Sequence, residues 1–374
     1  MIYSYRRPLG LLAAILLLSP FAACSGPASQ ATTQASATAG QSTAPATSGS
    51  SPAASPVCAP GADGSLTPVN FQLNFAPGGY HAGFALALQE GYYKDAGLNV
   101  TLIKGTTSGL TAQLVASGQA GLAYSDAMTV MQLIGKGAKI KILSTIYQVG
   151  TKSVTALASS GIKTFADLKG KTVGMAVGEL TAVIPILLKA NNLTENDIKF
   201  VTLPGTSLAP ALMQHQVDAI LGSTDGYNLT LEQNNAGPLV VFPYYKYGVN
   251  TISTSIIASD SFLAEHGPIV KCFIQASLKG WDTAIKNPGG AVADLVKTFP
   301  NDTTPALASG QLKAAIELMC ANGAKSVGEA TAQAWQSTVD IGQQVLGLPT
   351  NLGPSDYHTN DYLPATMPTQ CPIG

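Results

Sequence analysis

The stretch FQLNFAPGGYHAGFALALQEGYYKDAGLNV, residues 71–100, decides the fold. Hydrophobic residues alternate over 71–75, which predicts a half-buried β-strand. A Pro-Gly-Gly turn follows, then a predicted helix over 81–94 and a second strand that begins at Leu98. Such a strand–loop–helix–strand unit indicates an α/β fold, in which ligands bind beyond the carboxyl ends of the strands. Three side chains are expected at that edge: Phe75, Tyr80 and His81.

Outward from this stretch, strand and helix patterns alternate, and the chain becomes helical after residue 268. Two strands, at 154–158 and 251–258, are predicted to cross between two α/β units. The sequence therefore predicts two lobes that can close on a ligand in a cleft. The expected segments are lobe 1 (67–155 plus 258–350), lobe 2 (156–257) and a C-terminal tail (351–374) that lies extended on the surface.

Composition excludes several classes of function. The chain has 374 residues, a formal net charge of −1 and only 11% charged residues, so a nucleic-acid partner is not expected. Its four histidines are scattered and no cysteines are close together, so neither a metal site nor a cofactor is expected. The chain has no G-x-S-x-G elbow, P-loop or G-x-G-x-x-G motif, so catalysis is not expected either.

The N-terminus has the pattern of an export signal. Arg6 and Arg7 precede an apolar run over 9–18, and Cys24 follows two alanines. Residues 1–24 are interpreted as a bacterial lipoprotein signal peptide that ends at a lipidated Cys24; an ordinary secretory signal is the alternative. Residues 25–66 follow, rich in Ala, Ser, Thr and Pro, and are predicted to form a disordered tether.

Four further cysteines remain in the expected folded part. An even number of cysteines in an exported protein suggests disulfides, and four cysteines allow three connectivities. We favour Cys272–Cys320, because both are expected on C-terminal helices, which leaves Cys58–Cys371. Buried free thiols are the alternative.

Several motifs together resemble the NMT1/THI5-like group of periplasmic binding proteins over residues 68–350. The first motif consists of Pro77, His81-Ala82-Gly83, Ala87, Gly91-Tyr92-Tyr93, Gly97-Leu98 and Val100. The others are VASGQAGLAYSDA at 115–127, IKTFADLKGKTVG at 162–174 and ALMQHQVDAIL at 211–221. The resemblance implies a type II periplasmic binding protein fold with two hinge-crossing strands.

The same resemblance implies a function. It implies a monomeric solute-binding protein of an ABC importer, lipid-anchored at the outer face of the cell membrane, that delivers a small molecule to the permease subunits. Relatives take up thiamine pyrimidines or their precursors, riboflavin, alkanesulfonates, taurine or nitrate. The fungal pyrimidine synthases of the group carry a CCCFC motif, which this chain lacks.

The ligand expected first is a thiamine pyrimidine precursor of the hydroxymethylpyrimidine or formylaminopyrimidine type. Pyrimidine-type relatives have a tryptophan two residues before the proline and an asparagine directly after it, where this chain has Phe75 and Gly78. Glu179 is expected to accept an amino N–H of such a ring and to repel an anion, whereas Asp126 is expected to cap a helix. An anion binder is the alternative, and a synthase-type enzyme is a distant one. The predicted ligand-binding residues are Asn74, Phe75, Tyr80, His81, Thr106, Thr107, Ser125, Tyr147, Gly178, Glu179, Thr181, Thr224, Asp225, Tyr227 and Tyr244.

Overall fold

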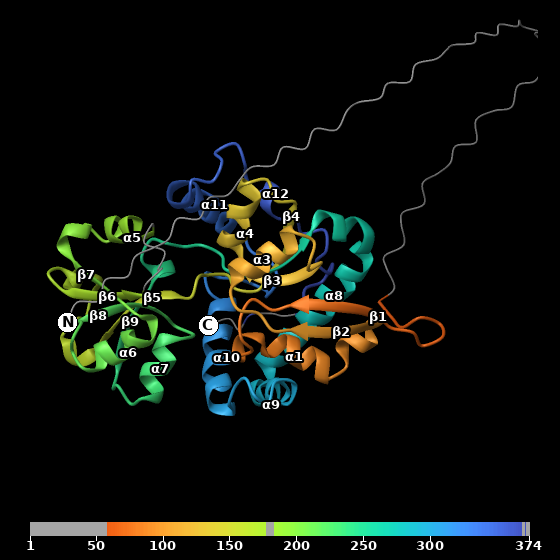
Figure 1. Cartoon of the computed structure of the whole chain (residues 1–374), viewed down its shortest axis with the longest axis horizontal. Helices are drawn as coiled ribbons and strands as arrows, with labels where there is room; N and C mark the ends of the chain where they lie inside the picture. Colours follow the sequence, from red (N-terminus) through yellow and green to blue (C-terminus); the bar gives the residue numbers. More distant parts are fainter. Residues whose placement is uncertain (1–57, 177–182, 369–370, 372–374) are drawn as a thin grey trace, which may run out of the picture. The chain divides into compact units, whose positions relative to one another are not determined.

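The computed structural model describes residues 58–176, 183–368 and 371 (Figure 1). The predicted signal peptide, the lipidation at Cys24, most of the predicted tether, and Gly178, Glu179 and Thr181 lie outside these residues. Among the residues that are described, no helix is both long and apolar enough to cross a membrane.

The first sheet has five strands in the order β2-β1-β3-β10-β4. Its strands are β1 (Thr67–Gln72), β2 (Leu98–Ile103), β3 (Leu122–Asp126), β4 (Ile140–Thr145) and β10 (Thr254–Ser259). Strand β1 pairs in parallel with β2 and β3, whereas β10 lies antiparallel between β3 and β4. The loops after β1 and β3 therefore lie at the same edge of this sheet.

The second sheet also has five strands, in the order β7-β6-β8-β5-β9. Its strands are β5 (Lys152–Leu157), β6 (Thr172–Ala176), β7 (Lys199–Leu203), β8 (Ala219–Ser223) and β9 (Leu239–Pro243). Strand β6 is parallel to β7 and β8, and β5 is antiparallel to β8 and β9.

The predicted crossing strands are misplaced by a few residues. Strand β5 pairs only within the second sheet, and β10 pairs only within the first. The chain instead passes between the sheets along 146–151, before the first predicted strand, and returns along 244–253, which overlaps only the start of the second. Alternating hydrophobic residues indicate a strand that pairs with neighbours in a sheet. The crossing segments do not pair in a sheet, so this pattern could not locate them.

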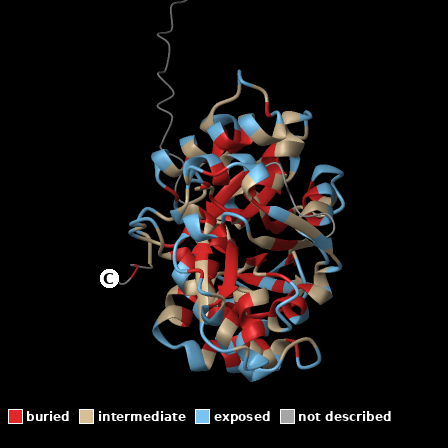
Figure 2. Cartoon of the chain, turned by 90° about the vertical axis from the view of Figure 1, so that its left-hand side faces the viewer, coloured by how far each residue is buried: buried red, intermediate tan, exposed pale blue. Residues whose placement is uncertain are grey.

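Helices cover both faces of each sheet. Alternate residues of a strand point to opposite faces, and in β10 Ile256 packs in one hydrophobic cluster with α1 and α8 while Ile257 packs in another with α4 and α11. Figure 2 shows this burial along the strands and on the helix turns that face them. The helices are α1 (Ala82–Gln89), α2 (Tyr92–Asp95), α3 (Ser108–Ala116), α4 (Ala127–Gly135), α5 (Ile184–Ala190), α6 (Gly205–Met213), α7 (Tyr227–Gln233), α8 (Asp260–Lys286), α9 (Pro288–Thr298), α10 (Pro305–Met319), α11 (Ala332–Leu346) and α12 (Pro354–Tyr357).

The helix predicted over 81–94 is divided into three short pieces. A 3-10 turn over Gly79–His81 precedes α1, and α2 starts after Gly91. Gly91 has φ +76°, a left-handed conformation that glycine adopts without steric cost and that interrupts a helix. The 3-10 turn is held against α10, because the Gly79 N–H donates to the Gln311 side chain at 2.9 Å.

The favoured disulfide pairing is wrong. The bonds are Cys58–Cys272 and Cys320–Cys371, with Cα–Cα distances of 5.4 and 5.3 Å. The first bond ties the start of the described chain to the middle of α8, and the second ties its end to the residue after α10. Neither bond joins two helices. Helix location alone does not decide which sulfurs approach each other, because pairing requires Cα atoms within about 7 Å.

The C-terminal tail is not extended on the surface as predicted. It includes α12, and the Tyr357 side chain is fully buried. His358 forms a parallel bridge with Ile142 of β4, so the tail covers part of that edge strand. A proline- and asparagine-rich segment can pack closely where a disulfide and an edge strand hold it.

Candidate functional site

One cavity of about 360 Å³ is lined by residues from both sheets. Residues that follow β1 and β2 and residues within β3 form one side, and the end of β8 with the loop after it forms another. The two segments that pass between the sheets contribute the rest, together with one residue of α10. The lining residues are Asn74, Phe75, Tyr80, Ser108, Tyr124, Asp126, Tyr147, Thr151, Ser223, Asp225, Gly226, Ser253, Thr254 and Gln311. Five of the predicted ligand-binding residues are among them: Asn74, Phe75, Tyr80, Tyr147 and Asp225.

Aromatic side chains form much of this lining. The Tyr80 hydroxyl donates to the Ala76 carbonyl at 3.1 Å, and the Tyr124 hydroxyl bonds to the Thr254 hydroxyl at 2.7 Å. Tyr147 is only 2% exposed, and its hydroxyl has no hydrogen-bond partner among the described residues. Phe75 lies beyond the end of β1 and is 51% exposed, so it forms part of the rim and not of the core.

Two carboxyl groups face the cavity. Asp126 caps α4, as expected, since its Oδ1 accepts from the Thr129 N–H at 3.2 Å, but its Oδ2 also accepts from the Ser253 hydroxyl at 3.0 Å. Burial raises the pKa of Asp126 above its usual value. Burial likewise raises the pKa of Asp225, and Lys152 partly opposes that rise. No lysine, arginine or histidine lines this cavity among the described residues.

His81 lies behind the cavity wall and does not line it. The ring is fully buried, and its Nε2–H donates to the Asn74 Oδ1 at 2.8 Å. Asn74 in turn donates from Nδ2 to the Ser108 hydroxyl at 3.3 Å. Burial lowers the pKa of His81 to about 3, so the ring is neutral at physiological pH. His81 therefore orients Asn74, and Asn74 is the residue that reaches the cavity.

Six other predicted residues that the structure describes do not line this cavity. Thr107 caps α3 by accepting from the Leu110 N–H at 3.1 Å, and Ser125 is buried and donates to the Ser108 carbonyl at 2.9 Å. Thr224 and Tyr244 line two other cavities. Two further residues are not among the residues that line it: Thr106 and Tyr227.

Several residues that line the cavity were not predicted from the sequence. Tyr124 and Ser223 lie at the ends of β3 and β8, where the rule for carboxyl ends of strands would have found them. Ser253 ends the second segment between the sheets, and Thr254 is the first residue of β10; this crossing was predicted a few residues too late. Gln311 lies in the middle of α10 and has no local signal, because only the packing of α10 against the 3-10 turn brings it to the cavity.

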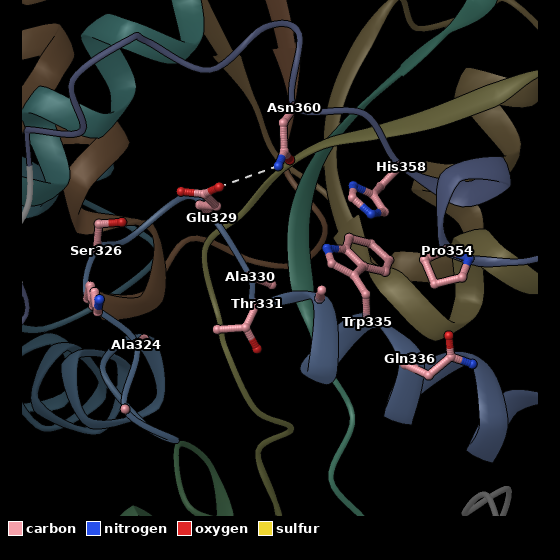
Figure 3. Close-up of a pocket in the computed structure, with 13 residues that line it drawn as sticks. Ala324, Ser326, Glu329, Ala330, Thr331, Trp335, Gln336, Pro354, His358 and Asn360 are labelled. Atoms are coloured by element: carbon pink, nitrogen blue, oxygen red, sulfur yellow. Dashed lines mark hydrogen bonds between the residues drawn. The ribbon is translucent and has the colours of Figure 1, made fainter.

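A larger cavity of about 560 Å³ lies elsewhere, between the 323–332 segment, α11 and the tail (Figure 3). The Trp335 indole has one face stacked on the His358 ring at 4.0 Å, and Glu329 accepts from Asn360 at 3.4 Å. Trp335 is buried, so it offers no open ring face to a flat ligand. The cavity between the sheets is therefore the better candidate.

Sequence comparison agrees with the resemblance found in the motifs. The model of the family described as NMT1/THI5 like matches residues 79–291. The chain belongs to this family.

Curated proteins similar to this chain include a binding protein and enzymes. A formylaminopyrimidine-binding protein of Halalkalibacterium halodurans is 26% identical over 236 residues, which are 62% of this chain and 70% of that protein. A 4-amino-5-hydroxymethyl-2-methylpyrimidine phosphate synthase of Candida albicans is 25% identical over 242 residues, 62% of this chain and 71% of that one.

Solved structures with the same fold include two sulfonate-binding proteins. The periplasmic aliphatic sulphonate-binding protein SsuA of Escherichia coli aligns with a TM-score of 0.61 at 15% identity, over 78% of this chain and 92% of that one. The alkanesulfonate-binding protein SsuA of Xanthomonas axonopodis, bound to MOPS, aligns with a TM-score of 0.57 at 15% identity, over 79% of this chain and 99% of that one. The predicted periplasmic binding protein fold is thereby confirmed.

Proposed function

We propose that this protein is the solute-binding component of an ABC importer and captures a small aminopyrimidine, a thiamine precursor of the hydroxymethylpyrimidine or formylaminopyrimidine type. One observation carries the proposal. The cavity between the sheets combines tyrosine side chains with two carboxyl groups, Asp126 and Asp225, and its described lining has no cationic side chain. An aminopyrimidine offers flat faces to the tyrosines and N–H groups to the carboxylates.

The same electrostatics argue against an anionic ligand. A sulfonate or nitrate in this cavity would lie near Asp126 and Asp225, and the described lining has no cationic side chain; the nearby Lys152 already acts on Asp225. Two unit charges of the same sign 4 Å apart repel by about 4 kcal/mol at the effective dielectric constant near a protein surface. The sulfonate-binding proteins therefore share the fold with this chain, and the lining of the cavity supports a different ligand.

The lining also favours binding over catalysis. Synthases are among the relatives, but the described lining contains no cysteine, histidine or lysine that could act as a nucleophile or proton carrier. The four cysteines of the described part are paired in disulfides. Disulfides form in oxidising compartments, which supports a location outside the cytoplasm. We further propose that Cys24 is lipidated, so that a tethered monomer delivers its ligand to permease subunits in the same membrane.

The proposed mechanism of capture uses the two segments that connect the sheets. Residues 146–151 and 244–253 act as a hinge, and the first sheet carries Tyr80 and Tyr124 while the second carries Asp225. The ring enters between the sheets, and Phe75, half exposed at the rim, is covered as they close on it. An occupied, closed protein is the form that a permease can recognise.

A thermal-shift panel tests the proposal directly. The full chain is heated with hydroxymethylpyrimidine, formylaminopyrimidine, riboflavin, taurine, an alkanesulfonate or nitrate. A ligand at about 100 times its dissociation constant adds about 2.7 kcal/mol to the free energy of unfolding, so binding raises Tm visibly. We expect the pyrimidines to stabilise the protein; stabilisation by the anions alone would overturn the proposal.

Phe75→Ala tests the rim aromatic. Loss of its stacking face and buried area should weaken pyrimidine binding about 5- to 30-fold, because offset stacking contributes about 0.5–1.5 kcal/mol beyond burial. Isothermal titration calorimetry measures the change. Leu110→Ala is the matched control, since Leu110 is similarly exposed (48%) and does not line the cavity. Equal pyrimidine affinity of Phe75→Ala and the parent would show that Phe75 does not contact the ring.

A further inference from the structure

The Tyr147 hydroxyl is the polar group in the cavity that most clearly lacks a partner. Tyr147 lies on the first segment between the sheets, directly beyond β4, and its side chain is 2% exposed. Tyr147 is one of the residues that line the cavity, yet its buried hydroxyl makes no hydrogen bond to a described residue. A buried hydroxyl without a partner costs about 1–3 kcal/mol, so such groups are rare and call for an explanation.

The neighbouring tyrosines show how a tyrosine hydroxyl is ordinarily hydrogen-bonded within the protein. Tyr80 and Tyr124 also line this cavity, and their hydroxyls are already bonded, to Ala76 and Thr254. Neither of them needs a ligand to be satisfied. Tyr147 differs because nothing in the described part of the chain offers its hydroxyl an acceptor.

The surroundings of Tyr147 keep its proton in place. Burial raises the pKa of Tyr147 well above its usual value, and the nearby Tyr124 and Asp225 raise it further. The hydroxyl is therefore a hydrogen-bond donor at every physiological pH. The effect of Asp225 also shows that this carboxylate, from the loop after β8, lies within electrostatic range of the hydroxyl.

We propose that Tyr147 selects the ligand: its hydroxyl donates to an acceptor nitrogen of the bound ring, while the Asp225 carboxylate accepts from the amino group beside that nitrogen. This inference rests on the proposed function and makes it more specific. The site would take rings with an amidine edge, in which a ring nitrogen adjoins the carbon that carries the amino group. It would discriminate against rings of the same shape that have C–H at that position.

The discrimination has a physical basis. A ring that lacks the acceptor leaves the buried Tyr147 hydroxyl in the complex without a partner, as it is among the described residues of the free protein. A site built to hydrogen-bond a ligand rejects the analogue that lacks the bonding group far better than it rejects a small change in size. Tyr147 would therefore affect specificity more than it affects stability.

Tyr147→Phe is the variant that tests this inference, with Tyr357→Phe as its matched control. Tyr357 is also fully buried with a hydroxyl that has no described partner, but it lies on α12 and does not line the cavity. The two variants therefore remove the same chemical group from similar burial. Neither should lower the Tm of the free protein, because neither loses a hydrogen bond, and this checks that both are folded.

Calorimetry then compares two probes on the parent and on both variants: 4-amino-5-hydroxymethyl-2-methylpyrimidine and the analogue with C–H in place of the ring nitrogen beside the amino group. We expect the parent and Tyr357→Phe to prefer the pyrimidine about tenfold or more. Tyr147→Phe should bind the pyrimidine about tenfold more weakly than the parent does, and should bind the two probes almost equally.

Failure of this inference differs from failure of the proposed function. If Tyr147→Phe binds the pyrimidine as tightly as the parent, the role of Tyr147 is refuted while pyrimidine binding stands. If the parent binds taurine, sulfonate or nitrate and no pyrimidine, the proposed function and the amidine-edge selection fail together. The donor role of Tyr147 is then tested on that anion, and it is refuted if Tyr147→Phe leaves the affinity of the anion unchanged.

Discussion

At the residue scale, the site depends on side chains that hold other side chains in place. His81 is buried and neutral, and the hydrogen bond of its ring Nε2 fixes the carboxamide of Asn74 at the cavity. The Nδ1 atom of His81 has no described partner, so the ring contributes orientation at some cost in stability. Asp126 has a similar double role, because it caps α4 while its carboxylate faces the cavity.

The buried His81 predicts a loss of stability in acid. Its pKa in the folded protein is about 3, whereas an unfolded chain binds the proton near pH 6.5. Between these values the unfolded state holds more protons, so the free energy of unfolding falls as pH drops from 6.5 towards 3, by up to about 5 kcal/mol. His81→Gln, which does not titrate, should flatten this decline.

Urea unfolding at pH 4.5 and pH 7.5 measures the effect of His81→Gln. His266→Gln is the control, because the side chain of His266 is 41% exposed. If the free energy of unfolding decreases equally for the parent and for His81→Gln between the two pH values, a group other than His81 causes the loss of stability in acid.

At the element scale, two helices that cross closely support the cavity wall. A Cβ on Gly280 of α8 would lie 2.3 Å from the Gly83 carbonyl oxygen of α1, and a Cβ on Gly83 would lie 2.2 Å from the Trp281 ring. The two glycines let α1 lie directly on α8, and α1 continues from the 3-10 turn that carries Tyr80. The sequence pattern of α1 did not reveal this crossing, because both glycines fit an ordinary helix.

Gly280→Ala should therefore destabilise the protein by about 1–3 kcal/mol, since α1 and α8 would have to move apart. Gly267→Ala on the same helix is the control: its Cβ would meet Tyr362 at an ordinary 3.5 Å, so the variant should be neutral or slightly stabilising. Thermal unfolding of both variants measures the difference. Equal Tm values for the two would contradict close packing at Gly280.

At the scale of the whole molecule, the disulfides fasten the two ends of the described chain. Cys58 is tied to α8 across 214 residues, and Cys371 is tied to the end of α10 across 51 residues. Between Cys320 and Cys371 lie α11, α12 and the bridge to the edge strand β4. The second disulfide therefore closes a loop around the segment that covers this edge.

Cys320→Ser with Cys371→Ser should lower the free energy of unfolding by about 2–5 kcal/mol, mainly by releasing constraint on the unfolded chain. The decrease in Tm relative to the parent, measured without reductant, tests this. Ligand affinity should be nearly unchanged, because neither cysteine lines the cavity between the sheets. An unchanged Tm would mean that the bond adds nothing to stability.

The amino-acid sequence by itself determined the α/β alternation, the family and five of the residues that line the cavity. The family follows from the motifs that resemble the NMT1/THI5-like group, whereas the alternation and the five residues follow from short-range causes: the period of hydrophobic residues, turn glycines and the rule that ligands bind at the carboxyl ends of strands. Tyr80, Asp225 and Asn74 could be named because each directly follows a strand or turn with a clear local pattern.

The tertiary structure alone decided which distant residues meet. The cysteine pairing, the burial of Tyr357 in the tail, the place of His81 behind Asn74 and the arrival of Gln311 at the cavity depend on packing between segments far apart in the chain. No local pattern encodes these contacts, because each of them results from how whole helices and strands pack. The hydroxyl of Tyr147 belongs to the same class, since its lack of a partner among the described residues is visible only in the folded structure.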